Sequence, residues 1–355
     1  MGRTNNREPL SAQVKRKVNT PVKEKSHEYE GDFGTVISTG STLLDLAISG
    51  GRVHGGGMPG GILIEAFGPS GSGKTVLLSE CAGEVQRKGG EVMFADPEAR
   101  LNTQFARIFD LDTSTIAYST PNTVTEVFEG VREWDPKPKG KTKIINGIFT
   151  DSLAALSTEM EMEKKEGDKM GMRRAKEFSE ELRKTCRILA ERNHLMMCSN
   201  QVRVNVDAGA YGQKYTTPGG ESIGFYASLR LRFSGASKIK GPKVKVGKKD
   251  IERIIGVQTT VEVHKSSIWK PFRSAPLIIL FDYGIDDIRA NLQFIKDYGK
   301  SSVYTVEGRS LSNSMEEAIS IVEQDELESV LKDEVIALWM KIERKFNTSR
   351  KHKER

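Results

Sequence analysis

The run Gly68-Pro-Ser-Gly-Ser-Gly-Lys74-Thr75 has the spacing of a phosphate-binding loop. It directly follows the apolar residues 62–67 and directly precedes a helical pattern, which is the context that this motif requires. Its glycines let backbone N–H groups point at phosphate oxygens, and the N-terminus of the next helix adds partial positive charge. The sequence therefore predicts a nucleoside triphosphate site with Lys74 on the β- and γ-phosphates and Thr75 on Mg²⁺. The predicted site consists of Gly68, Pro69, Ser70, Gly71, Ser72, Gly73, Lys74 and Thr75.

Two carboxylates that follow predicted strands are candidates for the same site. Asp151 closes the run Ile148-Phe-Thr-Asp151 and has the position of a carboxylate that orders the Mg²⁺ ligands through water. Glu98 comes just after the apolar residues 92–95, where it could face the γ-phosphate and position the attacking water. The residues alone leave a second interpretation of Glu98 open, namely an ordinary acid at the start of a helix.

A framework of alternating strands and helices is predicted to hold these residues at one edge. Strand and helix patterns that alternate at this spacing predict crossover connections and a parallel sheet covered on both faces. The predicted strands are residues 62–67, 91–95, 115–118, 144–150 and 194–199, and the predicted helices are residues 75–88, 123–134 and 174–192.

The pattern changes after Gly220. Residues 229–233, 257–264 and 276–281 form three strand patterns without helices between them, which predicts an antiparallel extension of the sheet. From Asp286 the chain is mostly helical with a short strand at 302–305, so we expect a small C-terminal domain at 286–346. Residues 1–35 are polar and predict a flexible basic N-terminal arm, and residues 347–355 form a basic tail.

Composition excludes several classes of protein. The 3 cysteines among 355 residues are scattered, which excludes a disulfide framework and a four-cysteine zinc module and indicates a reducing compartment. No apolar run approaches the ~20 residues of a membrane span, and charges stand where a signal peptide needs apolar residues. We therefore expect a cytoplasmic protein.

Positive charge is concentrated although the net charge is only +6. It gathers in the N-terminal arm, in residues 238–249 and in the C-terminal end beyond Lys341. Such clusters are typical of polyanion binding, and the alternative is a set of solvated segments that keep the protein soluble.

Further blocks accompany the phosphate-binding loop in a fixed order. They are residues 37–45, the glycine-rich 55–61, 96–101, 150–156, 199–203 and Gly219-Gly220 followed by Phe225-Tyr-Ala-Ser-Leu-Arg-Leu231. With these blocks the chain resembles the ATPase core of the RecA-type strand-exchange recombinases of bacteria and phages from about residue 36 to 281. The resemblance implies an α/β fold with a RecA-like P-loop NTPase core. In it a mostly parallel sheet with an antiparallel extension carries helices on both faces across residues 36–285, and a small C-terminal α/β domain follows.

The resemblance also implies roles for individual residues. Glu98 matches the catalytic glutamate of the family, and Gln201 matches the glutamine that senses the γ-phosphate and signals to the adjacent DNA-binding loop. Asn102 and Phe105 fall where the family contacts adenine. Lys265 matches the first of two lysines that reach the ATP of a neighbouring subunit.

Two DNA-binding loops are implied at residues 157–173 and 202–220, with Met170 as an apolar wedge against bases. The residues of the second loop alone leave two interpretations open. Its basic and aromatic side chains suit the binding of single-stranded DNA, and the alternative is a plain surface loop. The alternative interpretation of the helix after the first loop is that its charged residues form a solvated face. The implied DNA contacts are Met170, Arg174, Lys176, Ser179, Arg183, Arg203, Tyr211, Lys214, Tyr215, Gly219 and Gly220.

The chain departs from the family pattern in places. Ser267 occupies the position of the second in-trans lysine, so that one in-trans cation is missing unless Lys270 or His264 substitutes for it. The N-terminal arm lacks the apolar helical stripe with which the bacterial relatives dock on the next subunit. The basic tail replaces the acidic tail of those relatives, and we expect stronger nonspecific DNA affinity.

The sequence therefore leads to the hypothesis of an ATP- and Mg²⁺-dependent DNA recombinase. It would form a helical filament on single-stranded DNA, with ATP between subunits, and exchange strands with homologous duplex DNA. Two alternatives remain: a RecA-core motor or regulator of the helicase or clock type without strand exchange, and a DNA-binding filament protein that does not hydrolyse ATP.

Overall fold

A ten-stranded sheet forms the centre of the part of the chain that the structure describes. The structure is a computed structural model that describes residues 34–137, 144–158, 170–204, 215–216, 221–299 and 301–350. Residues Gly34–Arg355 form one compact unit. The predicted N-terminal arm lies outside the described residues except for its last two positions, 34 and 35.

Six neighbouring strands of the sheet run parallel. In spatial order they are β8 (Leu229–Phe233), β1 (Leu63–Gly68), β5 (His194–Gln201), β4 (Asn146–Thr150), β2 (Val92–Ala95) and β3 (Ala117–Ser119). β1 lies between β5 and β8 and is buried along its whole length. The five strands that the alternating pattern predicted for the parallel core are thus confirmed, and β8, which we predict as part of the antiparallel extension, adds a sixth parallel strand and joins the two parts.

The predicted antiparallel extension is also present. β12 (Ile254–Ser266) pairs antiparallel with β8, with β13 (Ser274–Leu280) and with β9 (Ser237–Lys240), and β14 (Gly284–Ile285) follows at the edge. Two short strands that the sequence analysis did not predict, β10 (Val244–Val246) and β11 (Lys249–Ile251), form a hairpin beyond β9. β10 reads Val-Lys-Val and β11 reads Lys-Asp-Ile, and these charged residues concealed the strand pattern.

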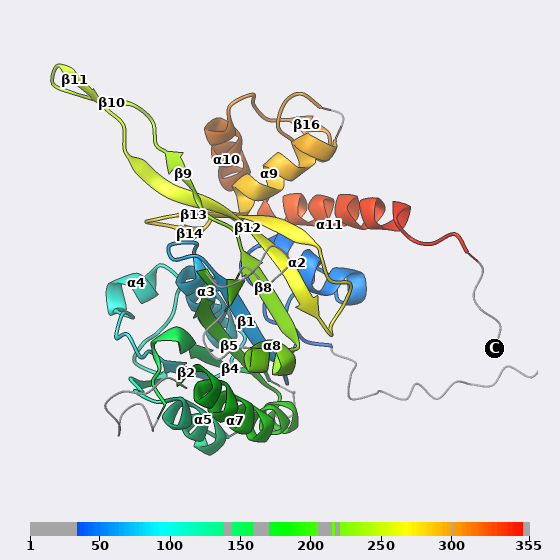
Figure 1. Ribbon diagram of the computed structural model, residues 1–355. Coiled ribbons are helices and arrows are strands. Elements are labelled where there is room, and N and C mark those ends of the chain that lie inside the picture. The colour runs from blue at the N-terminus through cyan, green and yellow to red at the C-terminus, as the bar shows by residue number, and fades with distance from the viewer. Residues whose placement is uncertain are drawn as a thin grey trace, which may run out of the picture. The chain divides into compact units, whose positions relative to one another are not determined.

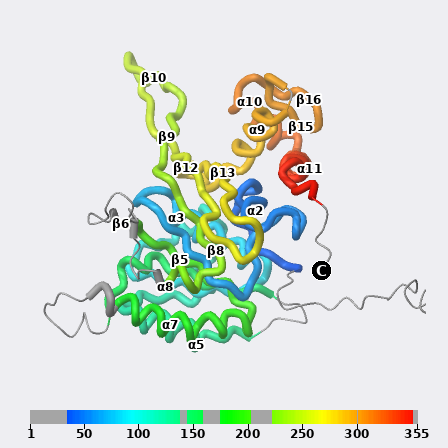
Figure 2. The backbone as a smooth tube through the Cα atoms, turned by 45° about the vertical axis from the view of Figure 1, so that its right-hand side comes forward, coloured from blue at the N-terminus to red at the C-terminus, as the bar shows by residue number. Residues whose placement is uncertain are grey.

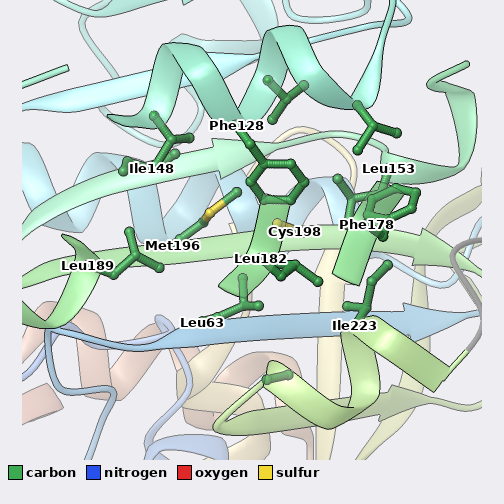
Figure 3. Close-up of a cluster of buried hydrophobic side chains, with 14 of the residues drawn as sticks. Leu63, Phe128, Ile148, Leu153, Phe178, Leu182, Leu189, Met196, Cys198 and Ile223 are labelled. Carbon is green, nitrogen blue, oxygen red and sulfur yellow. The ribbon is translucent and has the colours of Figure 1, made fainter. Parts of the chain in front are cut away.

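Helices cover both faces of the sheet (Figures 1 and 2). α5 (Val124–Glu133), α7 (Met170–Arg192) and α8 (Glu221–Tyr226) lie on one face, and α2 (Thr42–Ser49) and α3 (Lys74–Arg87) lie on the other. Figure 3 shows the core under α5 and α7, where Phe128 and Phe178 pack over Ile148, Met196 and Leu63 of three neighbouring strands. This packing fixes the height of α7 above the sheet.

Three helices make up most of the C-terminal region: α9 (Asp287–Tyr298), α10 (Met315–Gln324) and α11 (Glu328–Lys345). The strand predicted at 302–305 is wrong in its bounds, because the structure has β15 at Thr305–Val306, paired with β16 at Arg309–Ser310. The boundary that we predict at 285/286 stays a prediction. None of the helices in the described ranges is long and apolar enough to span a membrane.

Candidate nucleotide site and nucleic-acid interface

The phosphate-binding loop connects the end of β1 to the start of α3. Gly73 is the N-cap of α3 and has a left-handed backbone with φ of +94°. This backbone favours glycine, and a Cβ atom at Gly73 would also lie 2.3 Å from Cδ1 of Ile279, which would have to move. Gly71 also has positive φ (+70°), but open space surrounds it. Glycine at position 73 is thus favoured by backbone conformation and by limited space, whereas glycine at position 71 is favoured by backbone conformation alone.

Lys74 is buried beneath this loop. Its ammonium donates to the carbonyl oxygens of Pro69 (2.6 Å) and Gly68 (3.1 Å) and lies 3.5 Å from Oγ of Ser72. Burial lowers the pKa of Lys74, while the negative charge of Asp151 acts in the opposite direction. A buried ammonium bound to neutral loop oxygens is placed to exchange them for stronger, charged phosphate acceptors.

Asp151 follows β4 directly, as predicted, and is buried. Its backbone N–H donates to the Ala95 carbonyl (3.0 Å), which ties it to the end of β2, and its Oδ1 accepts from the Ser199 hydroxyl of β5. The adjacent Ser152 has a buried Oγ that finds no hydrogen-bond partner among the described residues. An unpaired hydroxyl beside a buried carboxylate leaves polar capacity for a further group, which fits a hydrated Mg²⁺ at this edge.

Glu98 lies in the turn after β2. Its carboxylate pairs with the Arg100 guanidinium at 3.0 Å, and about a fifth (22%) of its side chain is exposed. Glu98 is not in a helix, so the alternative interpretation as an acid at a helix start is wrong. The turn is held by Asp96, which accepts from the Leu101 N–H (2.8 Å) and the Tyr118 hydroxyl (3.0 Å).

Gln201 ends β5 next to the phosphate-binding loop. It pairs with Gly68 in the β1–β5 register, and the following Val202 N–H lies 3.4 Å from the Gly68 carbonyl. Its own N–H donates to Oδ1 of Asn200 at 3.0 Å. The structure therefore brings Lys74, Asp151, Glu98 and Gln201 to the carboxyl ends of neighbouring parallel strands, where open α/β sheets bind ligands.

The predicted adenine contacts lie on the short helix α4 (Thr103–Arg107). Asn102 is its N-cap and accepts from the Phe105 N–H at 2.9 Å, and the Phe105 ring meets that of Phe109 edge to face at 5.0 Å. The capping bond uses Oδ1 of Asn102, which leaves its amide NH₂ for a ligand.

Lys265 is placed at some distance from the phosphate-binding loop of its own chain. In the sheet register it pairs with Arg230, which in turn pairs with Glu65, three residues before Gly68. At about 3.3 Å per residue, Lys265 is roughly 10 Å from the level of the loop. Its ammonium donates to the carbonyls of Gly224 and Phe225, each at 2.8 Å, and burial lowers its pKa.

The residues around the missing second lysine are engaged elsewhere. The Ser267 hydroxyl lies 3.3 Å from the Ser228 carbonyl, and Nδ1 of His264 lies 3.3 Å from Glu262. The Lys270 ammonium lies 3.3 Å from Oδ1 of Asn347. Whether Lys270 or His264 replaces the second in-trans lysine stays a prediction.

α7 carries the predicted DNA contacts of the first loop, and it begins earlier than predicted. It starts at Met170, so that the predicted loop at 157–173 ends in four helical residues. Arg174 is half-buried and donates to the carbonyls of Leu153 (3.2 Å), Ala154 (3.3 Å) and Leu156. Lys176 and Arg183 are exposed and Ser179 is half-buried. Arg174 therefore holds the chain after β4, while Lys176 and Arg183 face solvent.

The second predicted loop contains one element that we did not predict. β6 (Arg203–Val204) pairs antiparallel with β7 (Tyr215–Thr216), which brings the two ends of the loop together. Four of the predicted DNA contacts, Tyr211, Lys214, Gly219 and Gly220, lie outside the described residues, as do the side chains of Met170, Arg203 and Tyr215.

Sequence reasoning missed the polar residues inside the strands. Glu65 in β1 is fully buried, accepts from Nε of Arg230 (2.7 Å) and from Nδ2 of Asn200 (3.0 Å), and joins three strands. A carboxylate within the apolar run Ile62-Leu-Ile-Glu-Ala-Phe67 is a signal that could have identified it, because a buried charge requires partners.

Comparison with known proteins places this geometry in a family. The model of the RecA N-terminal domain matches residues 14–286. Protein RecA of Thermus thermophilus is 35% identical over 253 residues, which cover 71% of this chain and 69% of that protein. Protein RecA of Ehrlichia canis is 33% identical over 309 residues, which cover 84% of this chain and 80% of that protein. A crystal structure of the RadB recombinase is 19% identical with a TM-score of 0.47, covering 70% of this chain and 98% of that one. Since the family model spans the sheet, the phosphate-binding loop and the strand ends around it, the chain belongs to the RecA family.

Proposed function

We propose that the protein is an ATP-dependent DNA recombinase that assembles on single-stranded DNA and exchanges strands with homologous duplex DNA. The observation that carries the proposal is the meeting of Lys74, Asp151, Glu98 and Gln201 at one edge of the sheet in a chain of the RecA family. No other arrangement of charged residues in the described part of the chain combines a phosphate-binding loop with carboxylates from neighbouring strands.

ATP is the substrate that this site suits. The backbone N–H groups of the loop and the Lys74 ammonium would bind the phosphates, since Lys74 can exchange the Gly68 and Pro69 carbonyls for phosphate oxygens. Thr75 and, through water, Asp151 would hold Mg²⁺, which neutralises charge that develops on the phosphates. Asn102 and Phe105 would contact the adenine from α4.

Hydrolysis needs a base and a sensor. Glu98 would accept the proton of the attacking water on a carboxylate oxygen. Gln201 would detect the terminal phosphate, and because it is followed within two residues by β6, a change at Gln201 would reach the ends of the second DNA loop. DNA would contact the two predicted loops and the exposed residues Lys176 and Arg183 of α7.

The Glu98→Gln substitution tests hydrolysis. We expect the ATPase activity stimulated by single-stranded DNA to fall by about 10²- to 10⁴-fold, because a general base is lost, while ATP binding and filaments remain. Turnover, nucleotide affinity and electron micrographs of filaments would be measured, with the exposed Glu133→Gln as the matched control. Unchanged turnover in Glu98→Gln would remove Glu98 from the mechanism. A wild-type protein without DNA-stimulated ATPase, or without transfer of a labelled strand from homologous duplex, would contradict the recombinase proposal.

Subunit mixing tests whether Lys265 acts on the ATP of a neighbour, as its distance from its own loop suggests. We expect Lys74→Ala and Lys265→Ala each to abolish most ATPase activity. Mixed in equal amounts they should recover a measurable fraction, because some interfaces pair an intact loop with an intact Lys265. The readout is ATPase rate against mixing ratio. If mixtures never exceed the sum of the two variants, Lys265 does not act between subunits.

A further inference from the structure

A basic hairpin projects from the sheet and is not used by the ATP site. It comprises residues 237–258, that is β9, β10, β11 and the first part of β12. Figures 1 and 2 show it leaving the body as a two-stranded ribbon with β10 and β11 at its tip. Its strands are paired at the root, from Ser237↔Gln258 to Lys240↔Ile254, and again at the tip, from Val244↔Ile251 to Val246↔Lys249.

The hairpin is strongly positive and its charges face solvent. It carries seven basic residues against two acidic ones: Lys238, Lys240, Lys243, Lys245, Lys248, Lys249 and Arg253 against Asp250 and Glu252. All seven are exposed. Lys240 pairs with Glu252 at 2.9 Å, whereas within the described residues no ion pair holds Lys243, Lys245, Lys248 or Lys249. A cluster of unpaired lysines on a projecting element attracts a polyanion.

The hairpin begins next to the nucleotide site. β8 ends at Phe233, and a Cβ on Gly68 would lie 2.6 Å from the Phe233 carbonyl, so the root of the ribbon touches the start of the phosphate-binding loop. The Ser234 carbonyl accepts from the Thr259 hydroxyl at 3.0 Å and closes this root. The ribbon is therefore anchored to the rigid sheet rather than to a loose segment.

We propose that this hairpin is a binding element for double-stranded DNA, lying in a groove with its lysines on the phosphates of both strands. The proposal rests on the function proposed above and adds to it the part of the chain that holds the incoming duplex. It concerns an element different from the two predicted DNA loops and from α7.

The dimensions of the ribbon suit a duplex groove. The major groove is about 12 Å wide and accepts a two-stranded β-ribbon. From Lys238 to the turn at Gly247 the ribbon is at most about 30 Å long, close to one turn of the duplex. Lysines on both strands and at the tip can thus reach phosphates on both sides of the groove.

Composition favours a duplex over a single strand. Residues 237–258 contain no Phe, Tyr, Trp or His, although sites for single strands stack bases on aromatic side chains. Six of the seven basic residues are lysine, which binds phosphate as a point charge and does not form the paired contacts by which arginine reads guanine. Contacts to phosphates alone suit a protein that must accept any homologous duplex.

An acidic protein is the competing occupant, because the tip also exposes apolar side chains. Val244 (54% exposed), Val246 (58%) and Ile251 (39%) share one face of the tip. Two variants of the full-length protein separate the two occupants. One replaces Lys243, Lys245, Lys248 and Lys249 by glutamine, and the other is Val244→Thr/Val246→Thr, which keeps every charge. Replacing the same four lysines by arginine is the charge-matched control.

The experiment measures binding of labelled 40-base-pair duplex and 40-nucleotide single strand across a series of salt concentrations. We expect the glutamine variant to bind duplex at least about 10-fold more weakly near physiological salt. The slope of log affinity against log salt should fall by about 3 to 4, since each lost phosphate contact removes about 0.9. Single-strand binding and the ATPase that it stimulates should stay within about threefold of wild type. The arginine and threonine variants should also bind duplex within about threefold of wild type.

The inference would be overturned if the glutamine variant kept the duplex affinity and the salt slope of wild type. It would also be overturned by a loss confined to the threonine variant, which would indicate an apolar protein contact. An equal loss of duplex and single-strand binding would also overturn it. In each of these cases the wild-type protein still shows DNA-stimulated ATPase and strand transfer, so the failure is separate from a failure of the proposed function.

Discussion

Glu65 in β1 connects the carboxyl end of β5, where Gln201 lies, with β8 on the other side of β1. Its carboxylate accepts from Asn200, whose Oδ1 accepts from the backbone of Gln201, and also from Arg230, whose guanidinium lies 4.5 Å from the centre of the Phe67 ring. Arg230 in turn lowers the pKa of Lys265, after the larger effect of burial. A single buried carboxylate thus contacts residues beside both Gln201, the proposed sensor, and Lys265, the lysine proposed to serve a neighbour.

Removal of the Glu65 charge should destabilise the protein strongly. We expect Glu65→Gln to lower the free energy of unfolding by about 3 kcal/mol, because Arg230 then lacks its buried counter-charge. Urea unfolding of the nucleotide-free protein measures this change. The double variant Glu65→Leu/Arg230→Met removes both charges and should lie nearer to wild type. If the double variant were less stable than Glu65→Gln, the ion pair would not be the source of the effect.

At the residue scale the sequence predicted the charged groups that stand in a motif and missed those inside strands. The loop from Gly68 to Thr75 and Asp151 were predicted from spacing within a few residues. Glu65 and Asn200 are 135 residues apart and Glu65 and Arg230 are 165 apart, so no local pattern connects them. The roles of the predicted site residues themselves stay predictions.

At the scale of elements, α2 depends on a buried acid. Asp45 accepts from the Ser38 hydroxyl (2.5 Å), the Thr39 N–H (2.8 Å) and the Thr39 hydroxyl (2.7 Å), and so fixes the chain that leads into the helix. Burial raises its pKa to about 6, although these bonds and the Lys332 charge act in the opposite direction. The helix start is further capped by Ser41, which accepts from the Leu44 N–H.

This raised pKa predicts a pH-dependent stability. Between about pH 4 and pH 6 Asp45 is still protonated in the folded protein but ionised in the unfolded chain, so folding becomes less favourable as pH rises. The quantity to follow is the free energy of unfolding of wild type minus that of the Asp45→Asn variant. We expect this difference to fall by about 3 kcal/mol across the window and to level off above it. Denaturant unfolding of both proteins from pH 4 to 8 measures it. A difference that is flat, or that rises with pH, would contradict the assignment.

The elements themselves were largely predictable. Every strand predicted for the parallel core has a counterpart within a few residues, because apolar runs and glycine turns are local signals. α2 was not predicted, because all eight of its residues are buried and it therefore lacks the polar face that makes a helix visible in sequence. β10 and β11 were hidden by lysines that face solvent, where charge does not oppose a strand.

At the scale of the whole molecule, α11 is held against the connection between β12 and β13. Arg273 donates both Nε and Nη2 to the two carboxylate oxygens of Glu343, each at 2.9 Å. Beside this pair the Trp269 and Trp339 rings lie 5.4 Å apart. Gly50 lies so close that a Cβ there would be 2.5 Å from Trp269, so α2, this connection and α11 meet at one point.

Loss of the Arg273–Glu343 pair should loosen α11 without unfolding the core. A paired, partly buried guanidinium and carboxylate are worth about 1 to 2 kcal/mol, so Arg273→Ala should speed amide hydrogen exchange in Glu328–Lys345 by about 10-fold. Exchange in β1 and β5 should stay unchanged. Arg344→Ala, an exposed charge on the same helix, is the control. Equal acceleration in both variants would show that the pair does not hold the helix.

The sequence by itself determined the phosphate-binding loop, the order of strands and helices and the excess of lysine in residues 238–249. These are properties of residues close together in the chain, where backbone preference and side-chain periodicity act directly. Only the tertiary structure decided that β1 lies between β5 and β8, that Lys265 is level with Glu65 rather than with its own loop, and that the lysines line a projecting ribbon. Strand neighbours are chosen by burial and hydrogen bonding across more than a hundred residues, and that choice leaves no pattern in any short segment of sequence.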